Sequence, residues 1–219
     1  KWRVPDTGGM PIFRLGLEFL AKKKFDGKVA ILDMDWQGAP ADFTQRGMLM
    51  TSIWDLNPHW IASWASSAKQ FAPDSKYTYC ISHPDNNGVV TTGTLDWDDY
   101  SLESSLSFNL HCKGGLVIRS QGHRRYYAGI FSHGKKVSII MRKDEKIIEL
   151  AAKEFPYRED RLHKVKLMAK DNKLTLFIDG KEILRGEDPG GNYKSGGGGF
   201  IVEKGTVLAD SFVVRAMKP

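Results

Sequence analysis

The sequence predicts an all-β protein, an antiparallel β-sandwich of the jelly-roll type, from three observations. Apolar and polar residues alternate through most of the chain, which is the pattern of strands that bury one face. In the second half, turn-forming Gly, Asp, Asn and His residues interrupt the alternation after roughly every ten residues. The chain contains 22 glycines in 219 residues, which suits a fold with many tight turns.

The N-terminal third predicts one hairpin followed by less regular chain. Residues 12–20 and 28–36 alternate and flank a turn that contains Asp26-Gly27, so they are expected to pair. Residues 1–11 are expected to be an extended N-terminal segment. Residues 41–57 show no clear period.

Two interpretations compete for the stretch that follows. A strand would place Trp60, Ala62 and Trp64 on one face, and this is the interpretation we favour. The alternative is a short helix with Asn57 as its cap and Pro58 in its first position. Next, residues 76–82 and 88–94 predict two strands joined by a turn at 83–88.

The second half predicts a regular series of strands. In the first of them, Leu102, Leu106, Phe108 and Leu110 share one face. The expected strands are 101–110, 114–121, 124–131, 135–142, 146–155, 163–170, two strands within 173–186 that meet at Asp179-Gly180, 200–205 and 207–217. A glycine-rich turn is expected at 190–199, since no Lys-Ser/Thr or helix follows it as a phosphate loop requires. No linker is visible, so residues 1–219 predict a single β-sandwich domain.

The net charge of +6 is unevenly distributed. Residues 1–100 hold 10 Lys and Arg against 12 Asp and Glu, and residues 101–219 hold 22 against 14. The basic residues of the second half, such as Lys164 and Lys166, alternate with apolar residues, as on the solvent face of a sheet. The apolar runs are too short to span a membrane. We therefore expect neither nucleic acid nor a membrane as a partner.

Few residues have the spacing of a metal or nucleophile motif. Cys80 and Cys112 could form one disulfide, but buried thiols are the favoured interpretation. The six histidines lack the spacing of zinc motifs, and no Gly-x-Ser-x-Gly elbow occurs.

Asp33 and Asp35 are the candidate metal ligands. At positions i and i+2 of a strand, their carboxylates would point to the same side. Such a pair could bind calcium or act on a glycosidic bond, although a solvent-facing polar strand is the commoner explanation. Calcium is thus the single cofactor left open.

The densest acidic-aromatic cluster is Asp96, Trp97, Asp98, Asp99 and Tyr100. An aromatic ring can cover the apolar face of a sugar, while carboxylates accept hydrogen bonds from its hydroxyls. Trp97 and Asp98 are therefore candidate ligand-binding residues. A core Trp followed by an Asp-rich turn is an equally acceptable interpretation.

The stretch 119–127 is the most unusual segment, because long basic donors lie beside aromatics. Alternation places Arg125 and Tyr127 on one face and Arg124 and Tyr126 on the other. Arginine and aromatic groups together suit recognition of a glycan or phosphate. The candidate ligand-binding residues here are Arg119, Gln121, Arg124, Arg125, Tyr126 and Tyr127. A hairpin whose arginines pair with acidic residues is the alternative.

The run from His163 to Met217 resembles the closing half of concanavalin A-like lectin and glucanase sandwiches, including laminin-G-like modules. LDMDWQGAP (32–40), TTGTLDWDDY (91–100) and GGLVIRSQGHRRYYAG (114–129) resemble a β-rich domain that lies C-terminal to the catalytic domain in bacterial ADP-ribosylglycohydrolase proteins. The resemblance covers about residues 12–217 and implies an accessory role. It does not imply hydrolase activity, since that catalytic part is helical and no such pattern occurs here.

Three functions therefore compete. The favoured one is a non-catalytic, lectin-like domain that binds a carbohydrate or another sugar-containing ligand, within a larger glycan- or ADP-ribose-processing protein. The alternatives are a glycoside hydrolase with paired carboxylates and a structural or protein-interaction domain. Exposure of Trp97, Tyr126 or Tyr127 in a groove would favour sugar binding over the structural or protein-interaction function, and burial of all three in the core would reject sugar binding.

Overall fold

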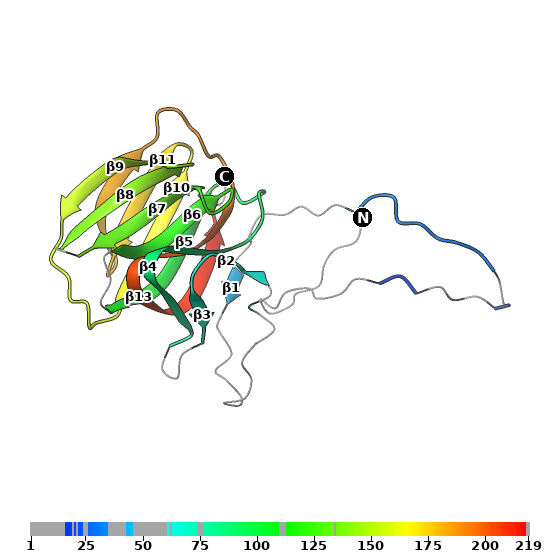
Figure 1. Cartoon of the computed structure of the whole chain (residues 1–219). Helices are drawn as coiled ribbons and strands as arrows, with labels where there is room; N and C mark the ends of the chain where they lie inside the picture. The colour runs from blue at the N-terminus through cyan, green and yellow to red at the C-terminus, as the bar shows by residue number, and fades with distance from the viewer. Residues whose placement is uncertain are drawn as a thin grey trace.

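The computed structural model describes residues 16–18, 20, 22–23, 26–34, 43–45, 61, 63–73, 77–109, 113–133 and 135–217. Within these residues it is an antiparallel β-sandwich (Figure 1). The strands are β1 (Phe43–Gln45), β2 (Ala65–Ser66), β3 (Gln70–Ala72), β4 (Tyr79–Thr92), β5 (Tyr100–Asn109), β6 (Lys113–Ser120), β7 (Arg125–Ser132), β8 (Lys136–Lys143), β9 (Lys146–Glu154), β10 (His163–Lys170), β11 (Lys173–Ile178), β12 (Lys181–Glu187) and β13 (Gly197–Ala216). No helix in these ranges is long and apolar enough to cross a membrane.

Two long strands, β4 and β13, run through both layers of the sandwich. Gly197–Glu203 of β13 pairs with β6 and with the second half of β4. Beyond a register shift at Glu203/Gly205, β13 pairs with β5 and with the first half of β4. The first layer therefore has the order β2-β4-β13-β6-β7-β8-β9, and the second has the order β3-β4-β13-β5-β10-β11-β12, with β1 also on β13.

The main core lies between the two layers. Leu116, Tyr127 and Ile139 of the first layer face inward toward Leu102 and Leu167 of the second, and all five are buried. Gly129 allows the layers to approach, because a Cβ there would lie 2.9 Å from a methyl carbon of Leu176. At the other end, the ring of Trp64 packs against those of Phe71, Tyr79, Phe200 and Phe212.

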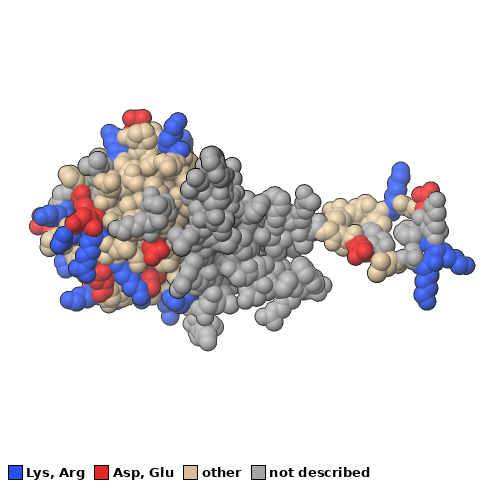
Figure 2. Space-filling model, turned by 90° about the horizontal axis from the view of Figure 1, so that it is seen from below, with Lys and Arg blue, Asp and Glu red and all other residues tan. Residues whose placement is uncertain are grey.

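Many of the charges in the second half lie in pairs on the solvent faces of the sheets. Lys113 pairs with Glu203 across β6 and β13, and Lys164 with Glu103 across β10 and β5. Figure 2 shows acidic and basic side chains interspersed on the sandwich. This distribution agrees with the interpretation of the basic half as solvated strands.

The strands from β5 to β12 confirm the sequence prediction closely. The predicted strands 114–121, 124–131, 135–142 and 146–155 correspond to β6, β7, β8 and β9. The predicted strand 163–170 is β10, and the pair joined at Asp179-Gly180 is β11 and β12. The fold class, an antiparallel all-β sandwich, is confirmed.

The predicted turn at 83–88 is wrong. These residues continue β4 from one layer into the other, and Asn86 N donates to His83 Nδ1 at 2.9 Å within the irregular stretch. Pairing with β13 on both sides overrides the local turn preference. The turn at 190–199 is also too long, because Gly197–Gly199 belong to β13.

The N-terminal predictions are wrong where the structure describes them. Residues 16–18, 20, 22–23 and 26–34 include no strand, so the hairpin of 12–20 with 28–36 does not form there. Ile61 and Ser63 lie in a short 3₁₀ turn, not in a strand. Trp60 and Ala62 themselves lie outside the described residues. Cys112 and residues 1–11 also lie outside them, so the thiol state of Cys112 and the extended N-terminal segment remain predictions.

Candidate functional site

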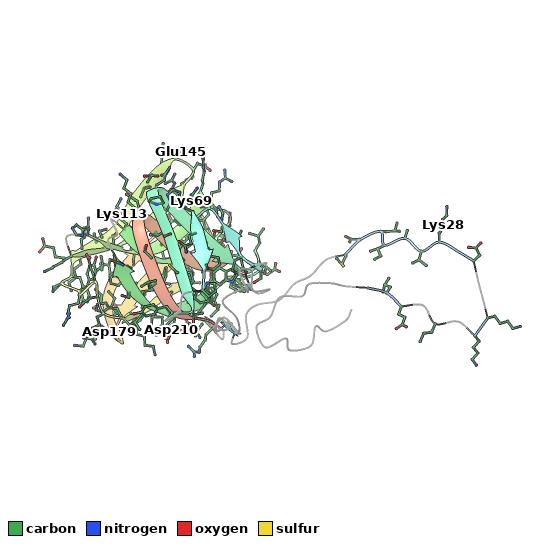
Figure 3. All side chains as sticks on the ribbon, turned by 60° about the horizontal axis from the view of Figure 1, so that its bottom comes forward. Lys28, Lys69, Lys113, Glu145, Asp179 and Asp210 are labelled. Carbon is green, nitrogen blue, oxygen red and sulfur yellow. The ribbon has the colours of Figure 1, made fainter. Side chains whose placement is uncertain are left out.

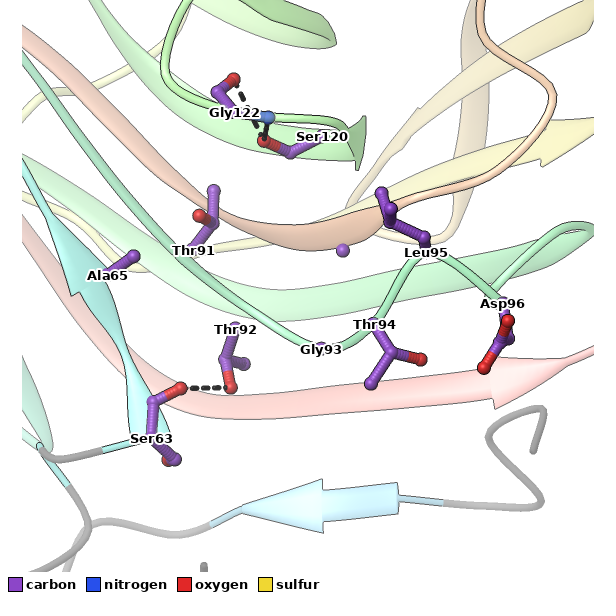
Figure 4. Close-up of a pocket in the computed structure, with 11 residues that line it drawn as sticks. Ser63, Ala65, Thr91, Thr92, Gly93, Thr94, Leu95, Asp96, Ser120 and Gly122 are labelled. Carbon is purple, nitrogen blue, oxygen red and sulfur yellow. Dashed lines mark hydrogen bonds between the residues drawn. The ribbon is translucent and has the colours of Figure 1, made fainter. Parts of the chain in front are cut away.

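A pocket lies where neighbouring strands of the first layer begin and end. β4 ends at Thr92, β13 begins at Gly197 and β6 ends at Ser120, and these strands are adjacent in the sheet. The loop 93–96 and the β6–β7 turn extend beyond the ends, and between them lies a cavity of about 500 Å³ (Figure 4). Cavities of this size accommodate small-molecule ligands.

The pocket is lined mainly by hydroxyls, backbone and one carboxylate. The lining residues are Ser63, Ala65, Thr91, Thr92, Gly93, Thr94, Leu95, Asp96, Ser120, Gly122 and Gly197. Among the described residues, Asp96 is its acidic group and no Lys or Arg lines it. Leu95 is 64% exposed and supplies an apolar surface at the rim. The lining thus offers donors and acceptors for a neutral, hydroxyl-rich ligand.

Several of these hydroxyls are fixed and one is not. Thr92 Oγ1 donates to Ser63 O at 2.7 Å, and Ser120 Oγ donates to Gly122 O at 3.1 Å (Figure 4). Thr94 Oγ1 is buried and has no hydrogen-bond partner within the described chain. A buried hydroxyl without a partner is uncommon, and a ligand or water in the pocket would satisfy it.

Trp97 lies beneath the pocket loop and not at its surface. A Cβ on Gly93, whose φ is +102°, would lie 2.6 Å from the Trp97 ring, so the glycine lets the loop fold tightly over the indole. The ring also packs edge-on against Tyr100, and Gly196 N donates to Trp97 O at 2.9 Å. Trp97 therefore supports the pocket from below.

Arg119 forms a buried clasp that fixes the same loop. Its Nε donates to Asp98 O at 2.9 Å, and its other nitrogens donate to the carbonyls of Asp171 and Tyr193 and to the carboxylate of Asp99. Its backbone N donates to the Tyr100 hydroxyl, which donates to the carbonyls of Gly196 and Gly197. This clasp joins the loop 93–99 to the chain leading into β13.

A β-bulge explains why Arg119 points inward. In the pairing of β6 with β13, Val117 lies opposite Gly199 and Ser120 opposite Gly197, so β6 contains one extra residue. Arg119 has a φ of +51° there, and its side chain is 3% exposed. The predicted ligand-binding role of Arg119 is therefore wrong: its guanidinium is already occupied by the protein.

The predicted aromatic platform is not formed. Trp97, Tyr126 and Tyr127 are only 9%, 1% and 2% exposed, so none can stack on a sugar from the surface. Tyr127 faces the core between the layers, and Tyr126 packs with Val117 and Ile140 in a small cluster on the opposite face of the first layer. Burial raises the pKa of the Tyr126 hydroxyl to about 12.

The other predicted residues lie near the pocket end but outside its lining. Gln121 donates to Ser195 O at 3.2 Å, and Asp98 is exposed and accepts from Asp99 N. Arg124 pairs with Glu145, and Arg125 with Asp144 at 2.9 Å. These are the acidic partners that the alternative interpretation of the hairpin expects.

The metal-site prediction receives no support in the described residues. They contain no group of three or more His, Cys, Asp or Glu side chains arranged to hold an ion. Asp33 is exposed in the extended segment 26–34, and Asp35 lies outside the described residues. Calcium at this pair stays an untested prediction.

Asp188 fixes the loop that precedes β13. Its carboxylate accepts hydrogen bonds from Tyr127 Oη at 2.6 Å, Asn192 N at 2.7 Å and Gly190 N at 3.1 Å. Burial raises its pKa, but these hydrogen bonds outweigh burial and hold the pKa of Asp188 below its ordinary value.

Asp188 is therefore expected to contribute to acid sensitivity. Because its pKa is depressed in the folded state, its stabilising contribution is complete above about pH 4 and is lost as the pH falls through the folded pKa. Asp188→Asn should lower the free energy of unfolding at pH 7 by about 2 kcal/mol. Urea titrations at pH 7 and pH 3 should show that deficit shrinking in acid. Asp160→Asn, in an exposed pair with Arg158, should change little at either pH; a constant deficit for Asp188→Asn would contradict this role.

Sequence reasoning missed the residues that line the pocket. Thr91, Thr94 and Ser120 are ordinary strand-end residues, and nothing local marks them as neighbours. Asp96 belongs to the acidic-aromatic cluster, and it is the member of that cluster that reaches the cavity. The TTGT run of 91–94 before the cluster is the one local signal, since a glycine between threonines indicates a tight bend in a hydroxyl-rich segment.

Comparison with known proteins shows the fold. No family model and no curated protein matches the sequence. Among solved structures, the carbohydrate-binding module CBM66 from Bacillus subtilis is 14% identical with a TM-score of 0.63, covering 70% of this chain and 96% of its own. The carbohydrate recognition domain of Emp46p in a potassium-bound form is 11% identical with a TM-score of 0.57, covering 80% and 97%.

A protein of unknown function with a galectin-like fold, also from Bacillus subtilis, is similar in the same way. It is 15% identical with a TM-score of 0.56, covering 78% of this chain and 97% of its own. The predicted concanavalin A-like, lectin-type sandwich is therefore confirmed as a fold.

Proposed function

We propose that this protein is a non-catalytic, lectin-like module that binds a carbohydrate in the pocket at the ends of β4, β6 and β13. The observation that carries the proposal is the pocket lining, which combines several hydroxyls, the carboxylate of Asp96 and the exposed apolar side chain of Leu95. A sandwich of the same fold serves as a carbohydrate-binding module and as a carbohydrate recognition domain in other proteins.

Recognition would rest on hydrogen bonds and not on aromatic stacking. The candidate aromatics are buried, whereas Asp96 can accept from two sugar hydroxyls and Thr94 Oγ1 still needs a partner. Since no Lys or Arg of the described chain lines the pocket, a neutral sugar is the favoured ligand. Hydrolysis by paired carboxylates is the weaker proposal, because that mechanism needs two carboxyl groups and the described residues of the lining supply one.

We expect Asp96→Asn to weaken binding about 10- to 100-fold, because hydrogen bonds to a charged acceptor contribute about 1.5–3 kcal/mol. A glycan array with the wild-type protein would identify the sugar, and calorimetric titration would measure the variant. Asp98→Asn is the matched control: it lies two residues away, is exposed and does not line the pocket.

Equal affinity of Asp96→Asn and Asp98→Asn would reject this pocket. Failure of the wild-type protein to bind any glycan would favour the structural or protein-interaction function instead.

We further propose that the module belongs to a larger bacterial protein that processes glycans or ADP-ribose, as the resemblance of 32–40, 91–100 and 114–129 implies. The sequence that adjoins this domain in the full polypeptide tests that context.

A further inference from the structure

Exposed large apolar side chains are concentrated in two parts of the described chain. Six of them lie in the N-terminal segment (Leu17, Leu20, Val29, Ile31, Leu32 and Met34), and two are Ile147 and Ile148 on β9. Concentrations of exposed apolar residues commonly mark interaction surfaces. Figure 2 shows the N-terminal segment projecting from the sandwich, with uncharged atoms flanked by charged ones.

The first concentration is an extended arm, residues 26–34. Its residues 29–32 form a continuous apolar run that includes the β-branched Val29 and Ile31, yet the described residues of the arm pair with no strand. Leu32 is 94% exposed and Ile31 is 67% exposed. Figure 3 places Lys28 on this arm, apart from the sandwich. The arm is thus an extended segment with exposed apolar side chains and no strand partner among the described residues.

The second concentration is an open sheet edge. Within the described chain, β9 pairs with β8 alone and ends the order of the first layer. Ile147 and Ile148 are 53% and 40% exposed. A long edge strand with exposed apolar residues is a template for pairing with another strand. The outer edge of β9 is thus available for a further strand within the described chain.

We propose that the arm adds as an antiparallel strand to β9 of a second copy of this protein. In one antiparallel register, exposed apolar residues of the arm lie opposite the exposed isoleucines of β9, with Leu32 opposite Ile147 and Ile31 opposite Ile148. In the same register Asp33 lies opposite Lys146. Neither Asp33 nor Lys146 has an ion-pair partner among the described residues. Opposite charges directly across a strand pair stabilise it.

The register also has a natural end. β9 contains an extra residue between the partners of Ile139 and Ile140, so its regular pairing surface is interrupted at Leu150. The four residues 146–149 precede the interruption and include both exposed isoleucines. A second copy is the fitting partner because each copy carries one arm and one edge. A reciprocal exchange therefore covers both on both copies and closes the assembly as a dimer.

Sedimentation velocity on the full chain from 1 to 200 µM tests this proposal. We expect a monomer–dimer equilibrium, with Asp33→Lys and Lys146→Asp each raising the dissociation constant at least tenfold. Combining the two reversals should restore it to within about threefold of wild type, since the opposite charges face each other again. Leu162→Asp, at an exposed leucine outside both surfaces, should leave it unchanged.

Three results would overturn the proposal. One is a monomer at every concentration. Another is a dimer that the charge reversals do not affect or that the double reversal does not restore. The third is a monomer whose free energy of unfolding follows the same charge-reversal pattern, because the arm would then dock on β9 of its own chain. Unfolding curves of each variant in urea distinguish lost pairing from lost fold.

Discussion

Gly199→Ala is expected to prevent stable folding or to cost about 4 kcal/mol or more. Gly199 lies in β13 between Thr91 of β4 and Val117 of β6. A Cβ on Gly199 would lie 1.8 Å from Val90 O and 2.8 Å from Val90 C and Thr91 Cα. These are backbone atoms, so no rotamer change can relieve the clash, and the two strands would have to separate.

Urea unfolding followed by circular dichroism would measure this effect. Gly186→Ala is the matched control, because it is also a strand glycine but its Cβ would meet only side-chain atoms, the nearest at 3.3 Å. We expect that variant to lie within about 1 kcal/mol of wild type. A Gly199→Ala protein as stable as Gly186→Ala would show that β4 and β13 do not need this close approach.

Arg119→Met is expected to destabilise the protein by about 3–5 kcal/mol and to weaken sugar binding as well. The substitution preserves much of the side-chain volume but leaves the partly buried carbonyls of Asp98 and Asp171 and the buried carbonyl of Tyr193 without this donor. Loss of the clasp would also free the loop 93–99, which carries Asp96 into the pocket. Arg119→Lys should recover only part of the stability, because a lysine ammonium cannot reproduce the several hydrogen bonds that the planar guanidinium donates to separate acceptors.

Arg124→Met is the control for this prediction. Arg124 lies on the same hairpin, but its pair with Glu145 is exposed on both sides, and exposed pairs contribute little. Denaturation midpoints and sugar titrations should therefore separate the two arginines. If Arg119→Met and Arg124→Met behaved alike, Arg119 would not be a structural clasp.

The strands that could be predicted are those in which local pattern and tertiary pairing agree. In β10, Val165, Leu167 and Ala169 are buried while Lys164 and Lys170 are exposed, so alternation alone defines the strand. In β4, the turn-forming residues 83–88 indicate a reversal, but β13 pairs on both sides of them. The continuation of β4 from one layer into the other depends on its pairing with β13, which is distant in sequence, so no local pattern predicts it.

The segments 96–100 and 119–127 adjoin the pocket in the folded chain, but the sequence pattern did not predict which of their residues line it. Trp97 and Arg119 both contact Tyr100, and they support the pocket loop from the interior of the protein. Strict alternation cannot anticipate the bulge that turns Arg119 inward. Nor can it tell which side of a strand faces the opposing layer, and so it could not distinguish an exposed aromatic from a core one. The pocket itself depends on strand ends that become neighbours only in the folded sheet.

The path of β13 has a consequence for how the protein is made. β13 follows every other described strand in the sequence, yet it lies between β4 and β6 in one layer and between β4 and β5 in the other. While a ribosome is still synthesising residues 197–216, neither layer has its central strand. Earlier strands can form local hairpins, such as β6–β8, but the sandwich cannot close. The sandwich can therefore close only after residues 197–216 have been synthesised, and its folding is expected to be slow because distant parts of the chain have to pair.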